Sequence, residues 1–190
     1  RIPRGTGDRI KTDRRDALLL ARLHRAGELV RVHVPDPEDE AVRDLMRLRD
    51  DARRALQVAR QQLKAFLLRH GLNHPSSSSW GPAFFRYLST IEFRNELDHL
   101  TLSEYRLIVE QATERLKRLD QTILRAVENW RWMPLVRALQ ALRGVSVLIA
   151  LNTVAELGDL RRFDHPSKLM SFLGLVPSEY SSGGHQYRGS

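Results

Sequence analysis

Two long stretches in which apolar residues recur every three or four positions constrain this sequence most. From Val42 to His70, seven of the nine positions in this spacing are apolar, and from Leu102 to Trp130 all nine are apolar or aromatic. This spacing predicts long helices that bury one stripe and expose charged faces. We therefore predict an antiparallel coiled-coil hairpin over residues 36–130.

Local signals place the ends of these two helices. Asp36-Pro37-Glu38 is a typical helix start, and Gly71 a typical stop. The second helix is predicted to begin at Thr101, because Thr101-Leu102-Ser103-Glu104 has the spacing of a capping box. Between the two helices, residues 76–79 are predicted to form a flexible loop and residues 80–91 a short helix at the hairpin tip.

Shorter elements are predicted on both sides of the hairpin. A Leu-rich helix ending at Gly27 is followed by an alternating segment, residues 30–34, that predicts a strand, as at the end of an α/β domain. After the hairpin we expect only short helices. The predicted fold is mainly α, in three regions: residues 1–35, 36–130 and 131–190.

Charge is distributed unevenly along the chain. Residues 1–31 hold nine Lys and Arg against four Asp and Glu, residues 131–190 hold seven against four, and the residues between hold fifteen of each. Two basic ends around a neutral centre indicate two surfaces that face a polyanion such as DNA. No apolar run approaches the ~20 residues that span a bilayer, and cysteine is absent, so we expect a cytoplasmic protein without membrane contact.

The segment Lys11-Thr12-Asp13-Arg14-Arg15-Asp16-Ala17 holds the first candidate site. If a helix begins here, Asp13 and Asp16 lie on one face and could hold a hard cation such as Mg²⁺. Ordinary helix capping, or pairing of Asp16 with a neighbouring cation, explains the same pattern. Spacing alone leaves these alternatives open.

The C-terminal region offers two further candidates. Helices predicted at residues 135–142 and 147–157 flank Arg143-Gly144 and resemble a phosphate-holding helix-hairpin-helix, although an ordinary helical hairpin fits equally. Ser181-Ser182-Gly183-Gly184 puts a hydroxyl on a backbone that can approach a substrate closely, as a nucleophilic serine requires; a flexible linker has the same composition.

The order of these motifs carries a family resemblance. The Lys11–Ala17 segment, the Leu142–Val145 turn, and Gly174-Leu175-Val176-Pro177 leading to Ser181–Gly184 follow one another as in DEDD-type insertion-sequence transposases related to the Piv DNA invertase. The chain resembles this family over nearly its whole length, and the two ends are the specific parts. The hairpin would match many proteins.

This resemblance implies a RuvC-like, Mg²⁺-dependent nuclease domain, of which residues 1–35 are the end, and a C-terminal transposase domain, incomplete here. Asp13 and Asp16 would be the last two acids of the Asp-Glu-Asp-Asp set, with the first two upstream of Arg1. Ser182, with Ser181 as the less favoured choice, would attack a DNA phosphate. The family also implies a structured guide RNA, called a bridge RNA, that pairs with donor and target DNA. We assign nucleic-acid contacts to Lys11, Arg14, Arg15, Arg143, Gly144, Arg161, Arg162, Lys168 and Arg188.

Several expectations follow from this resemblance. The hairpin would join copies of the chain into a homo-oligomer, and the acids and the serine could meet between protomers. The family loop usually continues into basic residues, whereas here His185-Gln186-Tyr187 precede Arg188, which would weaken the grip on phosphate. The 190 residues alone are expected neither to bind Mg²⁺ tightly nor to cut DNA. The alternative is a non-catalytic accessory that binds DNA or RNA, or a decayed transposase.

Overall fold

The computed structural model describes residues 12–29, 32–74, 80–176, 179–182 and 185–188. Internal contacts divide the chain into two units, Arg1–Pro35 and Asp36–Ser190. The first contains helix α1 (Asp13–Arg25). The second contains the long helices α2 (Pro37–Arg69) and α4 (Glu96–Ala126), with the shorter elements α3 (Pro82–Ser89), α5 (Met133–Leu139), α6 (Val147–Leu157), η1 (Leu160–Arg162), α7 (Pro166–Phe172), β1 (Glu179–Ser182) and β2 (His185–Arg188).

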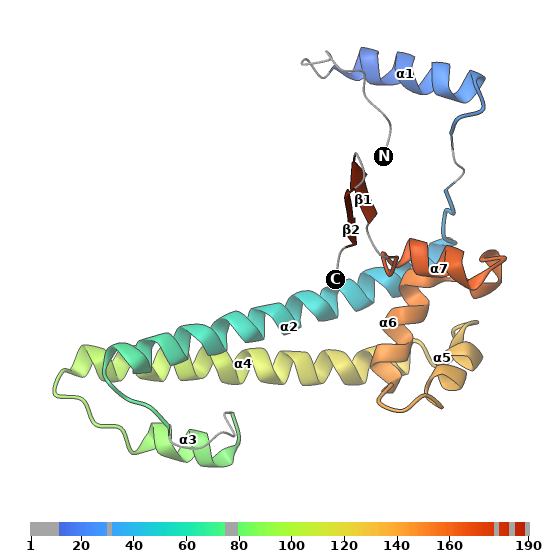
Figure 1. Cartoon of the computed structure of the whole chain (residues 1–190). Helices are drawn as coiled ribbons and strands as arrows, with labels where there is room; N and C mark the ends of the chain where they lie inside the picture. Colours follow the sequence, from blue (N-terminus) through green and yellow to red (C-terminus); the bar gives the residue numbers. More distant parts are fainter. Residues whose placement is uncertain (1–11, 30–31, 75–79, 177–178, 183–184, 189–190) are drawn as a thin grey trace. The chain divides into compact units, whose positions relative to one another are not determined.

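The helices α2 and α4 lie side by side and antiparallel, as the periodicity predicts (Figure 1). Contacts fix the direction, because Trp130 reaches Asp39 at the start of α2, whereas Tyr105 packs on Phe66 near its end. With 33 residues, α2 is about 50 Å long. It ends as predicted before Gly71, whose φ of +69° suits glycine.

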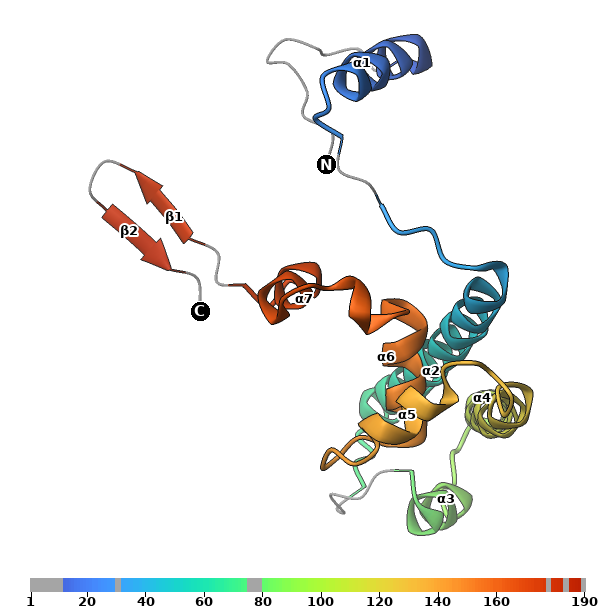
Figure 2. The same cartoon turned by 90° about the vertical axis from the view of Figure 1, so that its right-hand side faces the viewer.

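Two apolar clusters hold the hairpin at its two ends. The base cluster joins α2 and the end of α4 to α5 and α6, which lie beside the base of α2 in both views (Figures 1 and 2). The tip cluster joins α2, α3 and α4. Buried residues of the base cluster include Met46, Ile123, Val127, Trp130, Val136 and Leu151, and those of the tip cluster include Leu63, Phe66, Phe84, Leu88 and Val109.

Helix α4 begins at Glu96, five residues before the predicted start, so the capping-box prediction is wrong. Asn95 is the N-cap, and its side-chain oxygen accepts a hydrogen bond from the Leu97 amide at 2.9 Å. The Thr101 hydroxyl instead donates to the Leu97 carbonyl at 2.7 Å, as a threonine inside a helix does. The capping-box spacing at Thr101 was coincidental.

The predicted strand over residues 30–34 is also wrong in the part that the structure describes. Residues 32–34 form no regular element, and the side chains of Val32 and Val34 are 76% and 78% exposed. A strand needs a neighbouring strand to satisfy its backbone groups, and the described residues of the first unit contain none. The interpretation of residues 1–35 as the end of an α/β domain therefore rests on the resemblance alone.

A buried carboxylate fixes the base of the hairpin. Asp39, 5% exposed, accepts hydrogen bonds from the indole N–H groups of Trp130 (3.0 Å) and Trp132 (3.2 Å) and from Arg131. Burial alone would raise the pKa of Asp39, but the hydrogen bonds from Arg131, Trp132 and Trp130 outweigh it and lower the pKa below its ordinary value. Arg131 also bonds Asp36, at 2.6 Å, so the N-cap residue of α2 is tied to the end of α4.

Basic side chains of α2 hold α6 in place. The Nε atom of Arg43 donates to the Ala155 carbonyl at 3.0 Å, and its Nη2 atom donates to the Glu156 carbonyl at 3.3 Å. These bonds satisfy carbonyls of the last turn of α6, where a cation is also favoured by the helix dipole. Arg47 adds a bond to the Glu156 carboxylate at 3.1 Å. Helix α6 is therefore anchored to the hairpin by polar contacts as well as by the base cluster.

Among the described residues, no helix is both long and apolar enough to cross a membrane.

Replacing Asp39 with Asn is expected to lower the free energy of unfolding by about 2 to 4 kcal/mol, because it removes the partner of Arg131 and turns amide hydrogens toward indole donors. Urea unfolding followed by circular dichroism measures this. Asp44→Asn is the matched control, because Asp44 is exposed on the same helix and lies 3.9 Å from Arg47; it should change the free energy by less than about 1 kcal/mol.

The destabilisation caused by Asp39→Asn should depend on pH. The lowered pKa of Asp39 means that its stabilising contribution is complete above the unfolded-state pKa of about 4 and is lost as the pH falls through the folded-state value. The difference in Tm between the wild type and Asp39→Asn should therefore shrink below pH 4. A difference that stays constant down to pH 2.5 would contradict this account of Asp39.

Candidate functional site

The two candidate metal-binding acids lie in the first turn of α1. The Thr12 side-chain oxygen accepts a hydrogen bond from the Arg15 amide at 3.4 Å and caps the helix. Asp13 and Asp16 follow three residues apart and therefore share one side of the helix, as the spacing predicts. Asp13 is exposed and Asp16 half-buried, while Arg14 and Arg15 are exposed on the same turn. Both carboxylates can be reached from solvent within this unit.

These two carboxylates are a partial fit to a metal site. Oxygen ligands on one helix face suit Mg²⁺, which takes few protein ligands and completes its octahedron with water or substrate. Within the described ranges, no three or more His, Cys, Asp or Glu residues come together as a group that could hold a metal ion. The described chain therefore offers two ligands, Asp13 and Asp16, and a complete site would need groups from elsewhere.

The candidate nucleophile lies at the turn end of a β-hairpin. Ser182 is the last residue of β1 and pairs with His185, the first residue of β2; Ser181 pairs with Gln186. The alternative interpretation of this segment as a flexible linker does not fit the two serines, because they belong to strand β1. Arg188 lies at the other end of the same hairpin, opposite Glu179. Lys11 is outside the described residues.

The Arg143-Gly144 turn lies between α5 and α6. Gly144 has a φ of +85°, which favours glycine, and Val145 donates to the Leu142 carbonyl at 3.1 Å. Ser146 caps α6 by accepting a hydrogen bond from the Ile149 amide at 3.4 Å. Arg143 and Gly144 are both exposed. The turn is therefore open to solvent beside a helix N-terminus, and its contact with phosphate stays a prediction.

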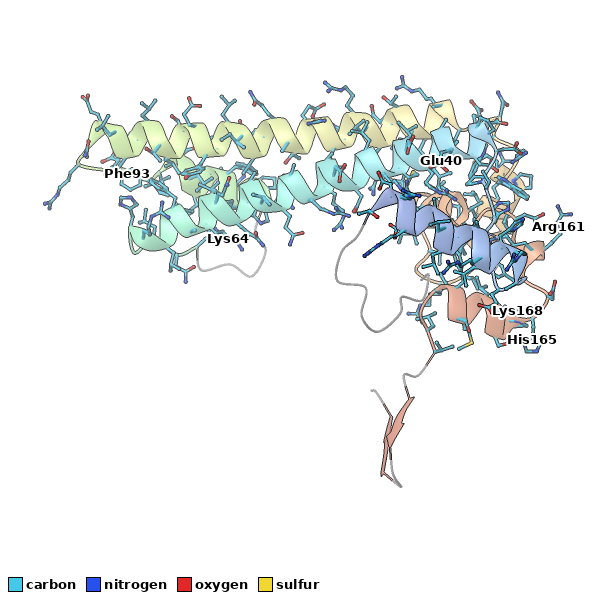
Figure 3. All side chains as sticks on the ribbon, turned by 90° about the horizontal axis from the view of Figure 1, so that it is seen from above. Glu40, Lys64, Phe93, Arg161, His165 and Lys168 are labelled. Carbon is cyan, nitrogen blue, oxygen red and sulfur yellow. The ribbon has the colours of Figure 1, made fainter. Side chains whose placement is uncertain are left out.

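Arg161 and Lys168 each have a carboxylate partner on the surface. The Nε atom of Arg161 lies 3.0 Å from Asp159, and the Nζ atom of Lys168 lies 2.6 Å from Asp164; Figure 3 shows both cations. The hydrogen bond to Asp159 raises the pKa of Arg161, and that from Lys168 lowers the pKa of Asp164. Exposed pairs of this kind contribute little stability, so a phosphate can compete for either cation.

Arg162 has a structural role that its charge alone does not reveal. Its Nε atom donates to the Leu157 carbonyl at 3.1 Å, and its guanidinium carbon lies 4.3 Å and 4.7 Å from the ring centroids of Phe163 and Phe172. The side chain thus links the end of α6 to α7. The sequence analysis grouped Arg162 with Arg161 because both are cations. A count of charges does not show that the Arg162 side chain lies against two aromatic rings and Arg161 does not.

Sequence reasoning assigned no chemistry to residues 80–91, yet one residue there lines a basic groove. Trp80 lies beside Arg60 and Lys64 of α2, whose charged groups are 5.1 Å and 5.6 Å from its ring centroid. The signal in the sequence is weak: two cations four residues apart on one helix face, and a tryptophan outside both long patterns.

Comparison with known proteins places two matches at the two ends of the chain. Residues 1–71 match the family model of IS110-type DEDD transposases, described as a transposase, and residues 136–190 match the model described as the transposase IS116/IS110/IS902 family. The first range contains Asp13 and Asp16, and the second contains Ser182.

Curated relatives carry related names. The chain is 43% identical over 182 residues to the putative transposase y4qE of Sinorhizobium fredii, which aligns 96% of this chain with 43% of the relative. It is 37% identical over 163 residues to the transposase for insertion sequence element IS1533 of Leptospira borgpetersenii, covering 85% and 47% of the two chains. It is 27% identical over 177 residues to the transposase for insertion sequence element IS1111A of Coxiella burnetii, covering 91% and 47%. The chain spans less than half the length of each.

Replacing Arg162 with Ala should loosen α7, because it removes a hydrogen bond and two cation–ring contacts worth together about 2 kcal/mol. Hydrogen exchange of the amides in α7 should accelerate about tenfold or more. Arg161→Ala, which removes an exposed pair on the adjacent residue, is the control and should leave that exchange unchanged. Equal effects of the two substitutions would refute the linking role of Arg162.

Proposed function

We propose that this chain belongs to the IS110 family of DEDD transposases and carries two catalytic acids and the nucleophile of an insertion-sequence DNA recombinase. One observation carries the proposal: each family match contains one half of the candidate chemistry, with Asp13 and Asp16 in residues 1–71 and Ser182 in residues 136–190. The catalysed reaction would be DNA strand cleavage and exchange.

In this proposal Asp13 and Asp16 are ligands of Mg²⁺ in a RuvC-like domain. Their position on one accessible helix face supports this role, and two further carboxylates would come from outside these residues. When bound, the metal polarises a phosphate and makes it a better electrophile. Mn²⁺, which prefers the same oxygen ligands, should be able to replace Mg²⁺ at this site.

Ser182 would be the nucleophile. Its hydroxyl oxygen loses its proton and forms a bond to the DNA phosphorus, while the bond from phosphorus to a sugar oxygen breaks. The sugar oxygen leaves as a hydroxyl by taking up one proton, so the number of protons is unchanged by the step. The phosphodiester is kept as a phosphoserine link, so a second sugar hydroxyl can reverse the step and join new strands. The end of β1 beside two glycines supports this choice, because a glycine backbone lets a bulky phosphate approach.

The nucleic-acid partners would be donor DNA, target DNA and a structured guide RNA. Exposed cations support this part of the proposal: Arg14 and Arg15 lie beside the acids, Arg143 lies in the turn before α6, and Arg161 and Lys168 lie in exposed pairs. They would contact phosphates and fix position, while sequence would be read by base pairing with the RNA. Arg162 is better suited to holding α7.

The hairpin would join copies of the chain. About 50 Å of helix is suited to a spacer or an assembly arm, and the acids and the serine lie at opposite ends of the sequence. We propose a homo-oligomer in which Asp13 and Asp16 of one protomer act with Ser182 of another. The competing function is a non-catalytic accessory that binds nucleic acid.

Mixed mutants of the full-length protein test the proposal. Asp13→Asn and Ser182→Ala should each abolish strand exchange, by about 10³-fold or more, while leaving DNA binding intact. If the site is shared between protomers, mixing the two inactive proteins should restore part of the activity in a plasmid recombination assay.

Two controls complete this experiment. Ser181→Ala should retain activity, since Ser182 is the proposed nucleophile. A mixture of Asp13→Asn with Asp16→Asn should stay inactive, because both substitutions damage the same half-site. Full activity of Ser182→Ala would establish the non-catalytic alternative, and failure of the mixed proteins would place the acids and the serine in one protomer.

A further inference from the structure

A groove on α2 near the hairpin tip has the composition of a nucleic-acid site. Its volume is about 410 Å³, and it is lined by residues of α2 and α4 and by Trp80, two residues before α3. Figure 3 shows Lys64 toward this end of α2, at the end away from Glu40. The lining contains three cations, two amides, one indole and two leucines: Arg53, Arg60, Lys64, Gln57, Gln61, Trp80, Leu56 and Leu116. Among the residues that the structure describes, the lining includes no carboxylate.

Trp80 orders two of these cations. The guanidinium carbon of Arg60 is 5.1 Å from the Trp80 ring centroid, and the Nζ atom of Lys64 is 5.6 Å from it. Trp80 is itself fixed, because its ring packs on buried Phe84 at 4.9 Å and its backbone has a φ of +78°, uncommon for a residue other than glycine. The tryptophan therefore holds two positive charges near each other, an arrangement that a bound anion would stabilise.

Arg60 supplies a second observation. Its Nε atom is buried, and within the described part of the chain it has no hydrogen-bond acceptor. A buried donor without an acceptor is destabilising, and the more so when it is charged. Arg53, by contrast, bonds the Asp50 carboxylate at 2.9 Å. Arg60 and Lys64 are the two cations of this groove that lie over the Trp80 ring.

A smaller hollow, lined mainly by apolar side chains, also includes Lys64. It has a volume of about 200 Å³ and includes Asn73 and His74. The His74 ring packs edge-on against Phe84 and Tyr87, at 5.4 Å and 5.0 Å. Lys64 lines both hollows, so donors on either side of it could contact successive phosphates of one strand.

We propose that this groove, formed by Arg60, Lys64, Trp80 and Gln61, binds the sugar–phosphate backbone of a nucleic-acid strand without reading its sequence. Positive charge, amide donors and an absence of carboxylates in the lining match a phosphodiester, and the leucines and the indole match the apolar faces of sugar or base. The site goes beyond the proposed strand exchange, because it lies on the hairpin and uses neither Asp13, Asp16 nor Ser182.

Binding of labelled 20-nucleotide strands to the 190-residue chain tests the proposal by fluorescence anisotropy. The double variant Arg60→Gln/Lys64→Gln should bind oligo-dT or oligo-U about tenfold or more weakly, with a salt slope smaller by about one to two. Arg118→Gln/Arg125→Gln removes two charges from exposed positions of α4 outside the groove and should weaken binding less than threefold. Circular dichroism and Tm confirm that both variants fold.

Comparing an RNA strand with a DNA strand shows which nucleic acid the groove binds. A larger loss with oligo-U than with oligo-dT assigns the groove to RNA, the reverse assigns it to DNA, and equal losses support a general backbone site. Equal weakening by the two double variants would overturn the proposal, since net charge alone would then explain binding. It would also be overturned if labelled polyglutamate bound the wild type more tightly than the strands at equal charge concentration and lost more affinity than they do in Arg60→Gln/Lys64→Gln, because the groove would then prefer an acidic peptide. Strand binding is measured here without Mg²⁺ and without strand exchange, so failure of the proposed catalysis is distinguishable from failure of this site.

Discussion

The buried carboxylate of Asp39 is the interaction on which the second unit depends. One side chain at the start of α2 accepts hydrogen bonds from three consecutive residues after α4, namely Trp130, Arg131 and Trp132. A buried charge is costly unless its partners are in place, so this contact permits one arrangement of the helix ends. The chain then enters α5 directly, which brings α5 and α6 onto the base cluster.

The hairpin is therefore a rod with two packed ends and different chemistry at each. At the base, Arg43 and Arg47 attach α6 to α2. Between the clusters, Arg49 bonds Asp120 across the two helices at 2.6 Å and replaces an apolar pair at a seam position. At the tip, α3 covers the hydrophobic cluster and Trp80 gathers cations beside it. A spacer with a basic groove near its end can position nucleic acid as well as separate protomers.

Sequence periodicity predicted the parts of this fold that local chemistry controls. The α2 stripe, the stops at Gly27 and Gly71, and helices α1, α3, α6 and α7 follow from spacing, prolines and glycines. The predictions failed where a local pattern fitted two structures. The residues from Thr101 have the spacing of a capping box, although Asn95 is the N-cap of α4. The alternating residues before Pro35 resembled a strand, but a strand depends on a neighbour that local sequence does not reveal.

Other features could not be predicted because they join distant residues. The partners of Asp39 lie about ninety positions away, and no spacing rule connects an acid in a first turn to tryptophans after another helix. Charge counts likewise selected Arg161 and Arg162 together, although one is paired on the surface and the other lies against two aromatic rings. For the candidate site, spacing established the shared face of Asp13 and Asp16, while the role of Ser182 came from the family resemblance.

Isolation of the covalent intermediate tests the central claim most directly. Full-length protein incubated with Mg²⁺ and labelled DNA, then denatured and digested, should yield a peptide with a nucleotide attached through phosphate to Ser182, and removal of Mg²⁺ should abolish the adduct. An adduct on Tyr180 or Tyr187, which pair with each other in the same β-hairpin, would contradict the serine mechanism. So would efficient strand exchange in which no protein–DNA link can be trapped.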